Sequence, residues 1–246
     1  MKTILITGAT SGIGWATVQL LAAQYRIIAC GRNKEQLNQL KKLYPENICT
    51  LNFDVRDKAS IFKALELLPT SFRNIDILIN NAGNAHGLAT FDEADLEDLD
   101  AMIDINVKGL IYVTKAVLPY MKDALAPIIL NISSIAGKET YMNGTTYCAS
   151  KAAVEALTKG MRLDLAHKGF RVASIAPGAV ATNFSLVRFK GDQERSAKVY
   201  EGYEPLKAED IADSIAYIIN SPDHVQIADL TILPKAQASA TTIIRK

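Results

Sequence analysis

The stretch Thr3-Ile-Leu-Ile-Thr-Gly-Ala-Thr-Ser-Gly-Ile-Gly14 carries the strongest structural signal in the chain. Its first five residues are apolar or β-branched, which is typical of a strand buried on both faces of a parallel sheet. A glycine-rich turn and a helical pattern of apolar residues follow. Strand, glycine turn and helix together predict a site where backbone N–H groups hold a pyrophosphate. The glycine spacing differs from G-x-G-x-x-G, and a flexible turn without a ligand is the alternative.

Length and composition limit the class of protein. With 246 residues, 49% of them hydrophobic, the chain can bury the core of one α/β domain. A formal net charge of +1 predicts neither a nucleic-acid partner nor a membrane surface. Three cysteines and three histidines without metal-like spacing predict no disulfide framework and no metal site. The lack of a signal peptide and of any long apolar stretch predicts a cytoplasmic protein.

Alternating strand and helix patterns predict the architecture. We expect one domain, 1–246, with a doubly wound, Rossmann-like parallel sheet of seven strands and helices on both faces. The cofactor half is expected at 1–130, and the catalytic and substrate half at 131–246. Strands are predicted at 3–7, 26–30, 48–53, 76–79, 128–132, 171–175 and 230–233. Helices are predicted after the glycine turn, at 34–43, at 58–68, from the acidic stretch 92–100 to near 124, from Gly144 to about 167, and at 208–219.

The second strand ends in Gly31-Arg32-Asn33. In a dinucleotide-binding fold an acidic residue near this point binds the ribose 2′-OH of NAD, and none is present here. The planar guanidinium of Arg32 suits a 2′-phosphate instead. A solvated arginine at a strand end is the alternative. The absence of the acid favours NADP over NAD.

Other predicted strands also end in polar residues. Asp54 follows the third strand, where its carboxylate is placed to contact an adenine. Asn80-Asn-Ala-Gly83 follows the fourth strand, and Ser133-Ser134 the fifth. Ligands of open α/β sheets bind at these carboxyl ends, although Asn-Asn pairs are also ordinary turn residues. Asn106 lies inside a predicted helix, where it is either solvent-facing or functional.

Tyr147-Cys-Ala-Ser-Lys151 places two polar side chains one helical turn apart on the same face. An ammonium beside a phenol favours the phenolate, so we expect the pKa of Tyr147 to fall below its ordinary value of about 10. A phenol tuned in this way can give or take the proton of an alcohol. The pair alone also occurs by chance in many helices.

Taken together and in this order, the motifs resemble the short-chain dehydrogenase/reductase family over nearly the whole chain. The matching elements are T-G-x-x-x-G-x-G at 7–14, N-N-A-G at 80–83, N-I-S-S at 131–134, Y-x-x-x-K at 147–151, and P-G-x-x-x-T at 177–182.

The resemblance implies a catalytic tetrad. Tyr147 is expected to be the general acid/base, and Lys151 to lower its pKa and hold the nicotinamide ribose. Ser134 is expected to bind the substrate oxygen, and Asn106 to anchor a water in a proton relay. The predicted cofactor contacts are Gly8, Thr10, Ser11, Gly12, Ile13, Gly14, Arg32, Asn33, Asp54, Val55, Asn81, Ala82, Gly83, Tyr147, Lys151, Pro177, Gly178, Val180 and Thr182.

A narrower resemblance points to the substrate. The stretches 74–78, 116–119 and 188–192 are similar to bacterial NADP-dependent 3-hydroxy acid dehydrogenases, a group that includes enzymes acting on serine and L-allo-threonine. Family members are commonly homo-oligomers, tetramers above all, so a tetramer or dimer is expected. A reductase of another carbonyl (3-oxoacyl thioester, sugar or polycyclic ketone) is one alternative. A non-catalytic dinucleotide-sensing protein is another.

The segment 180–206 mixes aromatic and charged residues without clear periodicity, and its length is typical of a functional lid. Most basic residues of such a segment are simply solvated. We expect Arg188 to bind a substrate carboxylate, because arginine grips a carboxylate with two parallel hydrogen bonds. It also lies in a stretch shared with the hydroxy acid enzymes. The expected substrate-binding residues are therefore Ser134, Tyr147 and Arg188.

Overall fold

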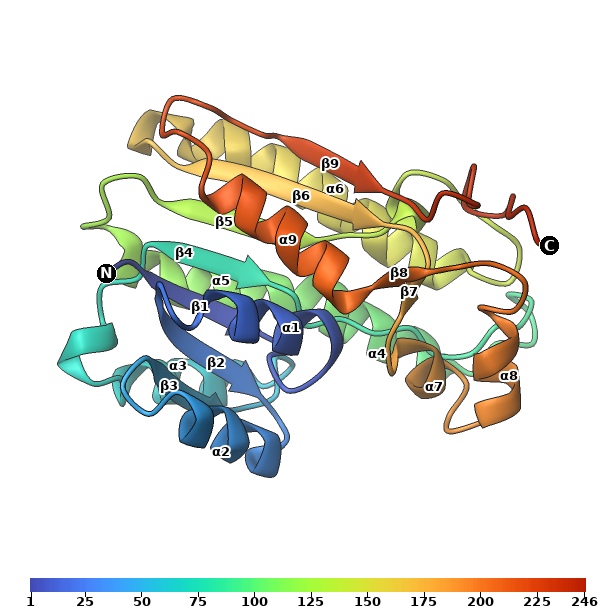
Figure 1. Ribbon diagram of the computed structural model, residues 1–246, viewed down its shortest axis with the longest axis horizontal. Coiled ribbons are helices and arrows are strands. Elements are labelled where there is room, and N and C mark those ends of the chain that lie inside the picture. Colours follow the sequence, from blue (N-terminus) through green and yellow to red (C-terminus); the bar gives the residue numbers. More distant parts are fainter.

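A seven-stranded sheet in which every strand runs parallel to its neighbours forms the centre of the protein (Figure 1). The computed structural model describes residues 1–246. The strand order is β3-β2-β1-β4-β5-β6-β9, so the chain reverses its direction of winding between β1 and β4. The predicted doubly wound, Rossmann-like sheet is confirmed. Its strands are β1 (Thr3–Thr7), β2 (Arg26–Gly31), β3 (Ile48–Asn52), β4 (Ile77–Asn80), β5 (Ile128–Ile132), β6 (Arg171–Pro177) and β9 (Asp229–Ile232).

Helices cover both faces of the sheet, with α1, α2 and α9 on one face and α3, α5 and α6 on the other (Figure 1). Within β1, Ile4 and Ile6 pack into the first layer, and Leu5 packs into the second. Successive side chains of a strand point to opposite faces, so a strand covered on both sides needs an unbroken apolar run. For this reason the side chains of β1 alternate between the two faces of the sheet, although Ile4, Leu5 and Ile6 are all apolar.

Most helices begin and end near their predicted bounds. Asn33 caps α2 by accepting hydrogen bonds from the N–H groups of Glu35 and Gln36, and Asp57 caps α3 in the same manner. None of the helices combines the length and apolar character that crossing a bilayer requires. Their bounds are α1 (Gly12–Leu21), α2 (Lys34–Leu43), α3 (Lys58–Glu66), α6 (Thr145–Leu165) and α9 (Ala208–Ile219), with short 3-10 turns at Thr70–Phe72, Ile135–Gly137 and Ala166–Lys168.

The long helix expected to end near residue 124 is interrupted, and in this respect the prediction is wrong. It consists of α4 (Leu96–Ile103), a π-helix (Asp104–Gly109), α5 (Leu110–Val117) and a 3-10 turn (Leu118–Met121). A π-helical turn contains an extra residue, which changes the direction of the side chains inside it. The side chain of Asn106 lies in this turn and is buried.

The segment 180–206 is more regular than its sequence suggests. β7 (Val180–Ala181) and β8 (Leu206–Lys207) pair in parallel and close the base of the segment. Two short helices, α7 (Phe184–Arg188) and α8 (Gln193–Lys198), lie between them. The Lys190 ammonium connects this segment to α4 through an ion pair of 2.9 Å with Asp98.

The residues after β9 pack against the 180–206 segment and its base. The side chain of Gln237 accepts a hydrogen bond of 2.9 Å from the backbone N–H of Ala179. The Arg245 guanidinium donates to the carbonyl of Glu201 and stacks over the Tyr203 ring, with 5.2 Å between its Cζ and the ring centroid. The sequence of the tail 235–246 predicts no structure. In the structure, the tail contacts both the base of the 180–206 segment and its C-terminal part.

Candidate active site

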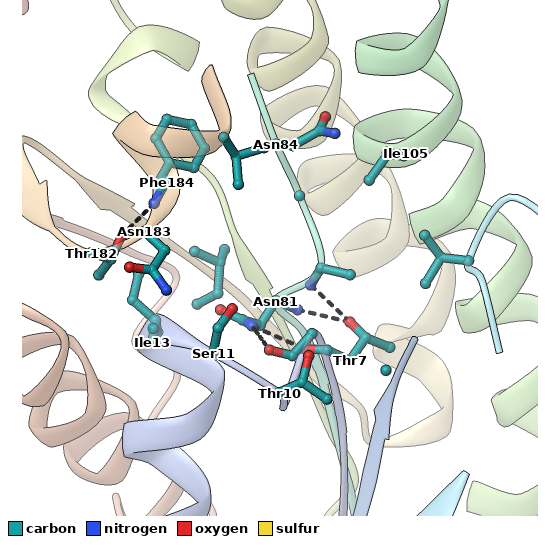
Figure 2. Close-up of a pocket in the computed structure, with 18 of the residues that line it drawn as sticks. Thr7, Thr10, Ser11, Ile13, Asn81, Asn84, Ile105, Thr182, Asn183 and Phe184 are labelled. Carbon is teal, nitrogen blue, oxygen red and sulfur yellow. Dashed lines mark hydrogen bonds between the residues drawn. The ribbon is translucent and has the colours of Figure 1, made fainter. Parts of the chain in front are cut away.

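A cavity of about 370 Å³ lies along the carboxyl ends of the strands, around the point where the winding reverses. Thr7, Thr10 to Ile13 and Asn81 border it on one side, and Thr182 to Phe184 face them from the 180–206 segment (Figure 2). Every predicted cofactor-binding residue except Gly14 lines this cavity. The sequence motifs, which are far apart in the chain, are thus brought to one place.

The glycine turn between β1 and α1 has the geometry of a phosphate cradle. Gly8 and Gly12 have φ angles of +65° and +50°, a left-handed conformation that other residues rarely adopt. Gly14 lies beneath the turn, where a Cβ atom would be 2.3 Å from the Gly8 carbonyl oxygen. Ser11 makes no capping bond through its side chain, so the first N–H groups of α1 remain available at the cavity. These features fit a pyrophosphate.

Asn80 and Asn81 have separate roles in holding the site together. The Asn81 amide donates to the carbonyls of Thr7 and Gly8 over 2.9 and 3.2 Å, which fastens the glycine turn to the end of β4. Asn80 is buried and donates to Thr114 Oγ1 and to Asn131 Oδ1, both at 2.9 Å. Asn80 is therefore a core hydrogen-bonding residue rather than an ordinary turn residue.

Two arginines lie near the end of the cavity that is next to the carboxyl ends of β2 and β3. Arg32 is largely exposed, and its Nη1 lies 3.5 Å from Asp54 Oδ2. Arg56, which the sequence analysis missed, holds the same carboxylate more closely, with 2.7 Å between Nη2 and Oδ2. The hydrogen bond from Arg56 is the main influence that lowers the pKa of Asp54. Asp54 thus lies at the cavity, where the sequence places it, but within an ion pair.

Tyr147 lies in the first turn of α6 and is 7% exposed. Its ring packs against Phe184 of α7, with 5.8 Å between the ring centroids. Burial raises the pKa of Tyr147 well above its usual range, and Tyr141 adds to this effect. The Ser134 side chain and the charge of Arg188 act to lower the pKa of Tyr147 but are outweighed. The prediction that this pKa falls is therefore wrong.

Lys151 follows one turn later on α6, and its ammonium is bound to a main-chain carbonyl. Its Nζ donates a hydrogen bond of 2.9 Å to the carbonyl of Ile132, at the end of β5. Burial lowers the pKa of Lys151 to about 8, while Glu155 acts to raise it. A Cβ atom at Gly83 would lie 3.3 Å from Lys151 Nζ and 3.1 Å from Asn106 Oδ1. Lys151 and Asn106 therefore border the same glycine.

Asn106 is brought close to the other tetrad residues but does not line the cavity. Its Oδ1 accepts from the N–H of Asn84, and its Nδ2 donates to the carbonyl of the same residue, both over 2.8 Å. The Nδ2 group also donates to Ser150 Oγ over 3.0 Å. Sequence reasoning missed Asn84 and Ser150. Asn84 follows the 80–83 motif directly, which was the available signal.

Arg188 lines a second, smaller cavity of about 40 Å³ that has Tyr147 as a shared wall with the first. Its Nε donates to the carbonyl of Gly87 over 3.1 Å, and its Nη2 to the Tyr141 hydroxyl over 3.4 Å. It takes part in none of the ion pairs of the structure. Nothing in the sequence marked Tyr141 as its neighbour. A half-buried cation without a carboxylate thus lies beside the tyrosine.

The family profile of the short chain dehydrogenases matches residues 2–192. The chain therefore belongs to the short chain dehydrogenase family, as its motifs predict, and shares that family's oxidoreductase fold. It is 42% identical to the NADP-dependent 3-hydroxy acid dehydrogenase of Salmonella typhi over 239 residues, which cover 96% of each chain. It is 41% identical to the serine 3-dehydrogenase of Rhizobium radiobacter over 239 residues, which cover 97% of this chain and 96% of that one.

A solved structure gives a similar result. The closed form of serine dehydrogenase complexed with NADP⁺ is 39% identical in sequence and superimposes with a TM-score of 0.94, covering 99% of both chains. The similarity extends over the whole chain, including the 180–206 segment and the tail.

Proposed function

We propose that the protein is an NADP-dependent oxidoreductase that transfers a hydride between the cofactor and the alcohol or carbonyl group of a small 3-hydroxy acid, such as serine or allo-threonine. The observation that carries the substrate class is Arg188, a half-buried cation outside every ion pair, beside Tyr147. The relatives named as 3-hydroxy acid and serine dehydrogenases support the same class.

The residues of the large cavity fit NADP. The uncapped N-terminus of α1 and the left-handed glycines suit the pyrophosphate. Arg32 is exposed at the end of β2, and its contact with Asp54 is loose enough for a phosphate dianion to replace it. The small residues from Asn81 to Gly83 and the stretch from Pro177 to Thr182 are proposed to hold the nicotinamide half. When bound, the cofactor supplies or accepts the hydride.

Tyr147 is proposed to move the proton that accompanies the hydride. In carbonyl reduction its hydroxyl donates a proton to the substrate oxygen, and in alcohol oxidation the phenolate takes that proton back. Because burial raises the pKa of Tyr147, the phenol is protonated at neutral pH, the form that reduction requires. Ser134 lines the same cavity as Tyr147 and is proposed to bind the same substrate oxygen and to stabilise charge on it.

Lys151 and Asn106 are proposed to support the proton transfer by Tyr147. The Lys151 ammonium uses one donor on the carbonyl of Ile132, which leaves donors for ribose hydroxyls at the cavity. Asn106 uses its Nδ2 group on protein atoms, but Oδ1 accepts only one hydrogen bond and retains a lone pair for a water. A positive charge at Lys151 favours loss of the Tyr147 proton when the substrate is oxidised.

Arg188 is proposed to bind the substrate carboxylate, and 180–206 to act as a lid of the single domain. Nη1 of Arg188 has no hydrogen-bond partner within the protein, so it is free to meet a carboxylate oxygen. Phe184 and Val187 of α7 line the large cavity and exclude water from the substrate. In this arrangement, 1–130 supplies most of the cofactor site, and 131–246 the catalytic residues and the lid.

We also infer a cytoplasmic homo-oligomer, either a tetramer or a dimer. All three cysteines are free, which suits a reducing compartment. The helices next to the site leave apolar side chains uncovered: Ile111 of α5 is 36% exposed, and Leu163 of α6 is 80% exposed. Light scattering during size-exclusion chromatography measures the mass of the assembly directly. A mass equal to that of one chain would contradict the homo-oligomer.

The function is tested by following NADPH absorbance with a substrate panel. L-Serine, L-allo-threonine and simple 3-hydroxy acids should reduce NADP⁺, whereas matched alcohols without the carboxylate should react at least about tenfold more slowly in kcat/KM, since they lose a charge-assisted pair. A preference for sugars, thioesters or neutral ketones would contradict the proposed substrate class of 3-hydroxy acids. No turnover with any substrate, alongside tight NADP binding, would point to a sensing protein.

A further inference from the structure

The face of α6 that carries Tyr147 and Lys151 continues to a third polar residue. Glu155 lies one helical turn beyond Lys151, and side chains at this spacing are neighbours on the helix surface. Both side chains are enclosed, with Lys151 5% exposed and Glu155 6% exposed. A buried carboxylate is costly unless charged or polar partners surround it. Glu155 takes no part in the proposed proton transfer, so its place here needs an explanation.

Three elements surround the Glu155 carboxylate. Lys138, at the end of the 3-10 turn after Ser134, places its ammonium 3.6 Å from Oε2. The Ser174 hydroxyl of β6 lies 3.3 Å from the same oxygen and 3.2 Å from Asp229 Oδ2 of β9, so its single proton is shared between the two carboxylates. Lys138 also pairs with Asp229, over 2.6 Å. The second oxygen of Glu155, Oε1, has no partner within the protein.

Lys151 has no ion-pair partner of its own within 4 Å. Burial lowers its pKa to about 8, which brings the neutral amine close to the working range of most enzymes. Glu155 is the charged group that acts against this change. The other groups facing the pair are Tyr147 on α6, Asn106 on the π-helix, Lys138, Ser174 and Asp229.

We propose that Glu155 is a positioning residue of the active site, a buried carboxylate whose task is to keep the Lys151 ammonium charged beneath the cofactor cavity. The proposal rests on the role assigned to Lys151 above. Lys138 and Ser174 fix the carboxylate in place, and its second oxygen, Oε1, has no partner within the protein. Without this anion, Lys151 loses its proton at a lower pH and no longer favours ionisation of Tyr147.

The test is the pH profile of kcat/KM for alcohol oxidation in Glu155→Gln. Glutamine keeps the volume and can accept the Ser174 hydrogen bond, but it removes the charge. The alkaline limb that reports loss of the Lys151 proton should move down by about one pH unit, the lower end of the range for one nearby opposite charge. Glu155→Asp retains the charge and should restore most of the wild-type profile. Melting curves show whether each variant is folded.

Two results would overturn the proposal. One is an unchanged profile in Glu155→Gln, and the other is an equal loss at every pH that Glu155→Asp does not reverse, since this indicates only a structural anchor. If the glutamine variant fails to fold, Glu155→Met takes its place, because Lys138 keeps its ion pair with Asp229 and no charge is left unpaired there. The same alkaline shift is expected. A wild-type enzyme without dehydrogenase turnover would instead refute the proposed function, which separates the two failures.

Discussion

The guanidinium of Arg188 lies over the ring of Tyr147, with 5.7 Å between its Cζ atom and the ring centroid. The two residues come from α7 and α6, and each lines the small cavity beside the large one. A cation in this place serves two purposes. It acts to lower the pKa of the phenol against the effect of burial, and it offers a free N–H group to an acidic substrate.

The first prediction concerns this cation. Arg188→Met keeps most of the side-chain bulk and removes the charge. We expect a loss of about 2–4 kcal/mol in transition-state binding of hydroxy acids, typical of removing one partner of a desolvated charge pair. Activity on a neutral alcohol should fall much less, since that substrate loses only the effect of Arg188 on the phenol. Arg195→Met is the control, because Arg195 is exposed in the same segment and stacks on Phe189 rather than on Tyr147. Equal losses on both substrates would mean that Arg188 only shapes the segment.

The second prediction concerns proton transfer. Tyr147→Phe removes one hydroxyl and almost no volume, so turnover should fall by about a thousandfold, within the usual range for a general acid/base. NADPH binding, measured by fluorescence titration, should remain within a few-fold of wild type because the ring still packs against Phe184. Wild-type kcat in this variant would remove Tyr147 from the chemistry.

The third prediction concerns cofactor choice. Arg32→Gln should raise the Kd for NADP by about tenfold, since an exposed charge-assisted contact to the 2′-phosphate is lost. The Kd for NAD should stay nearly constant. Lys42→Gln removes an equal charge from the far end of α2 and should affect neither cofactor. Isothermal titration with both cofactors measures these constants. A wild-type enzyme with higher kcat/KM for NAD would refute the assignment.

The fourth prediction concerns stability and pH. The pKa of Lys151 is lowered to about 8, below that of a lysine in an unfolded chain. The cost of burying the charge is therefore complete below pH 8 and disappears as the folded protein loses its proton between about pH 8 and 10.5. Relative to Lys151→Met, the wild type should gain about 2 kcal/mol in free energy of unfolding between pH 7.5 and 9.5. Urea unfolding at both pH values measures the gain, and parallel pH dependences would contradict it.

Local patterns in the sequence were sufficient for most of the fold. The apolar run of β1 and the caps of α2 and α3 depend on neighbouring residues alone, so they are visible before any tertiary structure is known. The π-helix is different. It has no periodic signature of its own, and it accompanies the two backbone hydrogen bonds that Asn106 makes with Asn84, a residue far from it in the chain.

The sequence predicts which residues form the site better than it predicts their pKa values. Helical spacing correctly placed Tyr147 and Lys151 one turn apart, but it does not show how deeply each is buried. Burial raises the pKa of the phenol and lowers that of the amine, and both effects arise from packing that includes Phe184 of a distant segment. Arg56 was missed because its pairing with Asp54 requires the turn that follows β3.

The close approach of Gly31 to Thr10 restricts how this protein can change its cofactor. A Cβ atom at position 31 would lie 2.6 Å from Thr10 Cγ2, so any side chain there requires Thr10 to move or to be replaced. An acidic residue placed at position 31 to bind the ribose 2′-OH of NAD thus meets the Thr10 side chain. A rotation of that side chain or a smaller residue at position 10 makes room for it. A change of cofactor at this position therefore involves residues 10 and 31 together.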